Sequence, residues 1–332
     1  MAHCRVYLFT YKRNQLLTRA VKSLLDQTFT SWICEVHNDC PEDPFPGEFI
    51  LSLNDQRFIM KNHDKNLGAV ASFNLAFAGC NEPYASILED DNWWEPDFLK
   101  EMTAVMDNDP SIKVSWSNMA LWREEPGNLW TDMHKTTWPD KQSRLFEWPQ
   151  ARQALSALHS NGAMLYRGQH ASKYLVPYSI LFNAVELIRE RSFEHPVYLH
   201  GKPLANFAVT LTTARDNDPY NWIATQVMLL ASFIATSPDK KRTMKESLAY
   251  HRVQRPVPIA TFFLANIFIL KNTRLYKYFT ITDWLLFGKW LLGNGRQLNY
   301  IKRYMASQSG TYRFLVKQTG LRYLEAEQNT KN

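Results

Sequence analysis

Residues 84–91 read YASILEDD, an apolar run that ends in three consecutive acids, Glu89, Asp90 and Asp91. Such a short apolar run is typical of a buried strand. A second run, residues 32–36, is followed in the same way by Asn38 and Asp39. Ligands of open parallel sheets bind outside the carboxyl ends of the strands. We therefore expect Asp39 and the acidic run to face one crevice, although 50 residues separate them.

The segments around these runs alternate between strand and helix patterns. Strands are predicted at residues 5–10, 32–36, 57–61, 84–88 and 113–117, and helices at 15–26 (with Asn14 as N-cap), 69–80 and 97–106. This alternation predicts an α/β protein with a mixed, mostly parallel, Rossmann-like sheet flanked by helices. Residues 118–150 show no clear period, so a long loop or small elaboration is expected there. Beyond residue 258 the pattern is helical and aromatic.

Length and composition allow one large domain or two. The chain has 332 residues, 45% of them hydrophobic and 21% charged, which are globular values. Its four cysteines form no CxxC pair and no zinc-finger spacing. No signal peptide and no spanning segment are expected, which predicts a cytoplasmic protein. GxGxxG, GxxxxGK[ST], GxSxG and HExxH motifs are absent from the sequence.

Charge is distributed unevenly along the chain. Residues 240–332 hold 17 Lys and Arg against 4 Asp and Glu, whereas residues 1–239 hold 21 against 28. A basic, aromatic tail suits an anionic membrane surface or a nucleic acid. Its Trp284, Phe287, Trp290, Tyr300 and Tyr304 are the candidate membrane residues. A helical layer with a solvated basic face explains the same composition.

Adjacent carboxylates at the mouth of a crevice repel each other unless a cation or hydrogen bonds compensate them. Carboxylate oxygens suit Mg2+ or Mn2+, which take phosphate oxygens as further ligands. The run from Glu89 to Asp91 therefore indicates a metal–diphosphate site. A solvated acidic turn before a helix gives the same pattern, because acids also favour a helix N-terminus.

Five segments, in order, resemble the family 2 glycosyltransferases of the GT-A fold. Residues 9–14 (FTYKRN) resemble the family's "TYNR" strand end, and residues 23–28 (SLLDQT) its "S-x-L-x-Q-T". Residues 31–43 resemble its "vvDDGStD" segment, Asn66 to Asn74 its "N-x-G-x-x-x-x-x-N", and residues 88–99 its DXD-type segment. The resemblance is strong over residues 5–106 and weaker through residues 161–167 and 186–205.

The resemblance implies a role for each matching residue. Thr10, Tyr11 and Arg13 would line the nucleotide pocket, and Asp39 would hold the base or ribose. Asn66 and Gly68 would let the backbone approach the nucleotide. Asp90 would contact the ribose or the metal-bound diphosphate, and Asp91 would ligate Mn2+ or Mg2+. The cation would neutralise the leaving nucleoside diphosphate.

The family typically inverts the anomeric carbon with a general base in an "ED-x-E-L-x-x-R" pattern. Residues 182–189 (FNAVELIR) match it at Glu186, Leu187 and Arg189, but Asn183 and Ala184 stand where the acidic pair is expected. Glu186 is therefore the candidate base, with Asp216 and Asp218 as alternatives. Glu186 could equally be an ordinary exposed helix residue.

The resemblance implies three parts: residues 1–118 as the nucleotide-sugar half, 119–238 as the acceptor half, and 239–332 as a helical extension. The expected activity is metal-dependent, inverting transfer of a hexosyl-type sugar from a nucleoside diphosphate to a glycan or lipid-linked acceptor in cell-surface polysaccharide synthesis. A catalytically inactive binding or assembly protein of the same fold is the alternative. We expect peripheral contact with the inner face of the membrane. A nucleic-acid partner is not expected, because the body is acidic.

Overall fold

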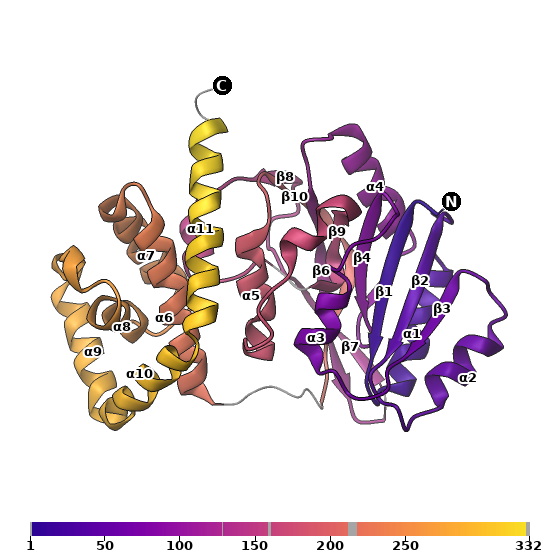
Figure 1. Cartoon of the computed structure of the whole chain (residues 1–332), viewed down its shortest axis with the longest axis horizontal. Helices are drawn as coiled ribbons and strands as arrows, with labels where there is room; N and C mark the ends of the chain where they lie inside the picture. Colours follow the sequence, from indigo (N-terminus) through magenta and orange to yellow (C-terminus); the bar gives the residue numbers. More distant parts are fainter. Residues whose placement is uncertain (1, 128, 159–160, 212–217, 330–332) are drawn as a thin grey trace. The chain divides into compact units, whose positions relative to one another are not determined.

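In a computed structural model, the chain is described over residues 2–127, 129–158, 161–211 and 218–329, the side chain of Asn272 excepted. It divides into two compact units (Figure 1). The first comprises Met1–Glu147, His159–Leu175 and Phe193–Ala214. The second comprises Trp148–Leu158, Val176–Ser192 and Arg215–Asn332. The three-part functional division expected from the sequence stays a prediction.

The first unit is built on one sheet, ordered β3-β2-β1-β4-β9-β6-β10-β5, with β7 beside β6 and β8 beside β10. Its strands are β1 (Cys4–Thr10), β2 (Trp32–Asn38), β3 (Phe58–Asn62), β4 (Tyr84–Glu89), β5 (Trp93–Trp94), β6 (Val114–Glu125), β7 (Leu129–Thr136), β8 (Arg144–Phe146), β9 (Met164–Arg167) and β10 (Val197–Val209). Pairing is parallel among β3, β2, β1 and β4 and between β6 and β10, whereas β5, β7, β8 and β9 are antiparallel to their neighbours. The predicted α/β class with a mostly parallel sheet is confirmed.

Helices cover both faces of the sheet in the first unit. They are α1 (Asn14–Leu25), α2 (Phe45–Ser52), α3 (Ala69–Leu75) and α4 (Phe98–Asn108). Successive side chains of a strand point to opposite faces. In β1, Val6 and Leu8 join the core that α1 and α4 share, while the ring of Phe9 packs edge-on against Phe73 of α3. Helices thus cover both faces of the sheet at β1, and apolar side chains of β1 point to both faces.

Three local predictions are wrong. The N-cap of α1 is Arg13 rather than Asn14, and it makes no side-chain cap. No helix was predicted between residues 36 and 57, yet α2 lies there and begins with Pro46 in its first turn, a position that tolerates proline. Residues 118–150 contain the rest of β6 together with β7 and β8. These strands escaped prediction because only the first half of β6 is buried, so the remainder lacks an apolar pattern.

The second unit is helical. It contains α5 (Val185–Arg189), α6 (Pro219–Thr236), α7 (Lys240–Gln254), α8 (Ala260–Phe268), α9 (Ile281–Asn294), α10 (Leu298–Ser307) and α11 (Ser309–Asn329), with short 3₁₀ turns between them. Its core is centred on α6 and α8, which are apolar on nearly every side. The expected helical, basic and aromatic C-terminal region is confirmed. Within the described ranges, every helix falls short of the length or the apolar character needed to cross a bilayer.

Candidate functional site

The end of β1 lies between the two acidic segments, as the parallel topology predicts. Beyond β2, the backbone N–H of Asp39 donates to the carbonyl oxygen of Thr10 at 3.0 Å. Beyond β4, the N–H of Asp90 donates to the carbonyl oxygen of Phe9 at 3.2 Å. Asp39 and Asp90 therefore flank one strand end, at the carboxyl edge of the sheet.

Asp90 and Asp91 form an acidic pair that Arg13 compensates. Asp90 is buried, and its Oδ2 accepts a hydrogen bond from the Tyr11 N–H at 3.2 Å. The Arg13 guanidinium donates to Asp91 and lies 3.5 Å from Asp90 Oδ1. Burial raises the pKa of Asp90, and the neighbouring charge of Asp91 raises it further. Burial also raises the pKa of Asp91, against the attraction of Arg13. The pair is thus a desolvated site that favours a cation.

Asp39 organises the loop that precedes α3. Its Oδ1 accepts from the Leu67 N–H at 2.7 Å and lies 3.0 Å from His63 Nδ1. Its Oδ2 accepts from the Gly68 N–H at 3.1 Å and from the Ser72 hydroxyl at 3.3 Å. Four partners saturate most of the acceptor capacity of a carboxylate. Asp39 therefore shapes the loop, and any base or ribose it holds must share these oxygens.

Two backbone positions near this edge have left-handed φ values. Gly68 has φ +77°, a conformation that side chains rarely adopt. Lys12 has φ +57° without being glycine. Tyr11, beside Lys12, leaves 46% of its surface exposed, and Asn66 is also exposed. The predicted pocket residues Tyr11 and Asn66 are thus exposed near this edge, whereas the N–H groups of Tyr11 and Gly68 are bonded to Asp90 and Asp39.

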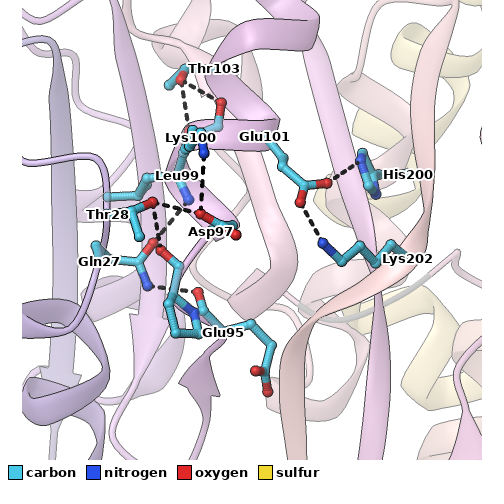
Figure 2. A network of polar contacts seen from close by, with 11 residues as sticks. Gln27, Thr28, Glu95, Asp97, Leu99, Lys100, Glu101, Thr103, His200 and Lys202 are labelled. Atoms are coloured by element: carbon cyan, nitrogen blue, oxygen red, sulfur yellow. Dashed lines mark hydrogen bonds and ion pairs between the residues drawn. The ribbon is translucent and has the colours of Figure 1, made fainter.

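The SLLDQT segment has a structural role that the sequence did not reveal. The Gln27 side chain donates to the carbonyl oxygen of Glu95 at 2.8 Å and accepts from the Leu99 N–H at 3.0 Å. The Thr28 hydroxyl donates to Asp97 at 2.7 Å (Figure 2). The end of α1 therefore holds the segment between Asp91 and α4 in place.

A second branch of this network ties α4 to β10. Glu101 of α4 lies 3.1 Å from His200 Nε2 and also accepts from Lys202, both on β10 (Figure 2). Both branches therefore hold α4, which is the first helix after the acidic run.

Arg19 connects the acidic segment to the β6–β7 hairpin. Its guanidinium carbon lies 3.8 Å from the ring centroid of Trp93 and 3.9 Å from that of Trp130. Its Nη2 donates to the backbone carbonyl oxygen of Asp91 at 2.8 Å. Burial lowers the pKa of Arg19 to about 10, so it stays charged at neutral pH. The sequence carried no signal for this cluster, because its members come from α1, β5 and β7.

The acidic pair fits a divalent cation only as a partial ligand set. No group of three or more His, Cys, Asp and Glu in the described ranges is arranged to hold a metal. Mg2+ and Mn2+ commonly take one or two carboxylates and complete their shell with phosphate and water. Asp90 and Asp91 match that donor set, with a diphosphate supplying the remaining oxygens.

The candidate base belongs to the second unit. Glu186 is half-buried in the first turn of α5. Of the two alternatives, Asp218 caps α6 by accepting from the Tyr220 N–H at 2.8 Å and also accepts from the Tyr300 hydroxyl at 2.9 Å. These bonds give Asp218 a structural role. Asp216 lies outside the described residues.

Taken together, the mostly parallel sheet and the acidic pair at its carboxyl edge define a GT-A type of glycosyltransferase fold. Residues 6–153, a little under half of the chain, match the family model described as glycosyl transferase family 2. This part of the chain is therefore similar to the family 2 glycosyltransferases.

One curated relative and several solved structures are also similar to this chain. One is WcaA of Escherichia coli (strain K12), whose name proposes a glycosyl transferase of colanic acid biosynthesis. It is 32% identical over 100 residues, which is 30% of this chain and 36% of WcaA. This chain thus matches only about a third of that relative's length.

Solved structures with the same fold include residues 1–349 of S. aureus TarS in complex with UDP-GlcNAc. That structure has a TM-score of 0.56 and 12% identity, and the match covers 100% of this chain and 92% of the TarS chain. A longer TarS structure gives a TM-score of 0.57 at 13% identity, over 96% of this chain and 55% of that one. At this identity the likeness supports the fold alone.

Proposed function

We propose that the chain transfers a sugar from a nucleoside diphosphate donor to a glycan or lipid-linked acceptor in cell-surface polysaccharide synthesis. The single observation that carries the proposal is the desolvated Asp90–Asp91 pair just beyond β4, compensated by Arg13. The name of WcaA supports a role in polysaccharide synthesis. The TarS complex with UDP-GlcNAc supports a nucleoside diphosphate sugar as the donor.

The donor site is proposed as follows. Thr10 and Tyr11 line the nucleotide pocket, and Asp39 holds the base or ribose. Asn66 and Gly68, in the loop before α3, let the backbone approach the nucleotide. Asp91 ligates Mn2+ or Mg2+, with Asp90 beside it, and the cation neutralises the departing diphosphate. When no sugar donor is bound, Arg13 pairs with Asp90 and Asp91. With donor and cation bound, the proposed role of its guanidinium is to contact the diphosphate, which a guanidinium binds in a bidentate manner.

Transfer is proposed to invert the anomeric carbon, with Glu186 as the base that deprotonates the acceptor hydroxyl. The match to the family's motif at Glu186, Leu187 and Arg189 supports this role. The cytoplasm, at the inner face of the membrane, is the proposed location, since lipid-linked acceptors are presented there.

Turnover tests the proposal directly. We would measure release of nucleoside diphosphate from UDP-, GDP- and dTDP-sugars with and without Mn2+, in wild type, Asp91→Asn and Glu186→Gln. Metal-dependent release from one donor, reduced at least about 100-fold in Asp91→Asn, is the expected result. Asp26→Asn, an exposed acid paired with Lys22, is the matched control and should leave release unchanged. Release that is equal in wild type and Asp91→Asn would remove Asp91 from the site.

An inactive sugar-nucleotide-binding or assembly protein is the second candidate. Asn183 and Ala184, which replace the acidic pair of the family's motif, favour it. The two functions differ in one comparison. An enzyme that uses Glu186 as base keeps donor binding in Glu186→Gln and loses transfer, whereas a binding protein shows donor binding without turnover in wild type as well.

A further inference from the structure

The outer side of α9 is an apolar surface that the described second unit leaves largely exposed. Ile281, Leu285 and Leu292 are exposed to 81%, 69% and 92%, and Trp284 to 50%. The spacing from 281 to 285 and 292 places these side chains along one stripe of a helix. We call Ile281, Trp284, Leu285 and Leu292 the α9 face. Figure 1 shows α9 at the margin of its unit.

The opposite side of α9 holds the helix on the core. Phe287 stacks on Phe263 of α8 with ring centroids 4.2 Å apart. Asp283 is buried and accepts from Arg252 of α7 at 2.6 Å. Trp284 also packs edge-on against Phe263, with ring centroids 4.7 Å apart, whereas Ile281, Leu285 and Leu292 are mostly exposed. Exposed apolar side chains that cluster on one helix indicate an interaction surface.

The charge of the stretch of sequence that contains α9 indicates the kind of partner. Seven basic residues lie between residues 271 and 303, all of them exposed: Lys271, Arg274, Lys277, Lys289, Arg296, Lys302 and Arg303. Asp283 is the single acid in that stretch, and its charge is already paired with Arg252. Lys289 follows Leu285 by four residues and precedes Leu292 by three, so it shares their side of the helix. An apolar stripe with basic and no free acidic neighbours complements an anionic lipid surface.

We propose that α9 docks on an anionic bilayer, with Ile281, Trp284, Leu285 and Leu292 entering the headgroup region and the surrounding Lys and Arg contacting lipid phosphates. This assignment differs from the aromatic set expected from composition. Phe287 is buried, Tyr300 bonds to Asp218, and Trp290 and Tyr304 pack against the core. Of that set, Trp284 alone belongs to the α9 face. The proposal is independent of the proposed glycosyl transfer, because docking requires no turnover.

Vesicle co-sedimentation of the full chain tests the proposal. The probes are vesicles of pure phosphatidylcholine and vesicles with one third phosphatidylglycerol, at low and high salt. We expect binding to the anionic vesicles that weakens with salt. The triple variant Ile281→Ser, Leu285→Ser and Leu292→Ser should bind at least about 100-fold more weakly. Lys289→Glu lowers the net charge by two units. Each unit of charge near the surface changes the binding affinity about fivefold, so this variant should bind more than about tenfold more weakly.

Two control variants distinguish binding through the α9 face from non-specific binding to vesicles. Leu51→Ser removes a leucine of α2 that is 82% exposed, and Lys22→Glu reverses an exposed charge on α1; both should bind as wild type. Circular dichroism checks that every variant is folded. Absence of vesicle binding, equal binding to both vesicle types, or full binding by the triple variant would each overturn the proposal. Self-association that the triple variant abolishes, without vesicle binding, would assign the face to a second copy of the chain instead.

Discussion

At the scale of single residues, the backbone conformation of Gly68 and the position of the Arg19 side chain support the carboxyl edge of the sheet, where the acidic residues lie. Gly68 accepts a φ that other residues avoid, and in that conformation its N–H donates to Asp39. Arg19 places one cation between two indole rings while it bonds to the backbone of Asp91. Both residues act on the site through its framework, and each can be tested by a substitution with a matched control.

Gly68→Ala should destabilise the protein, because alanine is strained at φ +77° and ψ +153°. The expected loss is about 1–3 kcal/mol of the free energy of unfolding. Gly288→Ala is the control: it lies within α9, with nothing within 4 Å of an added Cβ. There alanine should stabilise by about 0.5–1 kcal/mol. Urea unfolding measures both, and a shift of the same sign in the two variants would contradict the account.

Arg19→Gln should weaken donor turnover without unfolding the protein. It removes a cation that contacts Trp93 and Trp130, an interaction of about 1–2 kcal/mol in a desolvated setting. We therefore expect kcat/KM to fall about tenfold and the tryptophan fluorescence to change. Lys22→Ala, on the exposed side of the same helix, should alter neither. An unchanged emission spectrum in Arg19→Gln would mean that the stack does not exist in solution.

At the scale of elements, hydrogen bonds between helix ends and strand ends fix the segment that carries Asp91. Gln27 is the centre of this arrangement, because one side chain contacts the end of α1, the stretch after β5 and the start of α4 (Figure 2). The positions of the acids therefore depend on a residue that touches neither of them.

Gln27→Ala should leave the carbonyl oxygens of Ser23 and Glu95 and the N–H of Leu99 without this partner. The Glu95 carbonyl oxygen keeps the Phe98 N–H, which leaves two groups unsatisfied. Unsatisfied buried groups cost about 1–3 kcal/mol each, so we expect a loss of about 2–6 kcal/mol in the free energy of unfolding. Gln56→Ala, an exposed glutamine of the same unit, serves as control. Chemical denaturation distinguishes them. Equal stability of the two variants would show that the network in Figure 2 contributes nothing.

At the scale of the whole molecule, a largely buried polar chain runs from β2 to the loop beyond β3 in the first unit. Glu35 lies 3.3 Å from His37, His37 contacts His63 at 3.0 Å, and His63 reaches Asp39. Burial lowers the pKa of His37 to about 4, against the attraction of Glu35, while His63 and Lys61 add to the lowering. His37 is therefore neutral in the folded protein at neutral pH.

Stability should fall as the pH falls from about 6.5 towards 4. In that window the unfolded chain binds a proton at His37 that the folded chain does not, so the free energy of unfolding rises with pH. His37→Gln should flatten this dependence. His134→Gln, with a side chain that is 87% exposed, should leave it unchanged. The check is unfolding at pH 4.5, 5.5 and 7, and equal slopes in wild type and His37→Gln would refute the assignment.

Much of the fold could be predicted from the sequence where periodicity and burial agree. The strands ending at Thr10, Asn38 and Glu89 were predicted because each is an apolar run followed by polar residues. Topology then placed Asp39 and Asp90 beside one strand end without any contact being known. The β6–β7 hairpin could not be predicted, because most of its side chains are half-exposed and show no apolar alternation.

The partners within the site depend on tertiary contacts that local sequence does not encode. The stacking of Arg19 joins three elements, and the saturation of Asp39 requires the loop before α3 to fold back on β2. Similarly, composition indicated a basic aromatic tail, but burial decided that Phe287 belongs to the core and Leu285 to the surface.

Donor binding measured by thermal shift tests the central claim most directly, because it requires neither acceptor nor turnover. We would screen UDP-GlcNAc and other UDP-, GDP- and dTDP-sugars with and without Mn2+, in wild type and Asp91→Asn, with Asp26→Asn as control. A donor at 100 times its Kd should stabilise wild type and the control by about 2.7 kcal/mol when Mn2+ is present. The account predicts no such stabilisation in Asp91→Asn. Stabilisation that is equal in Asp91→Asn, or absent from wild type with every donor, would contradict a nucleotide-sugar site at the Asp90–Asp91 pair.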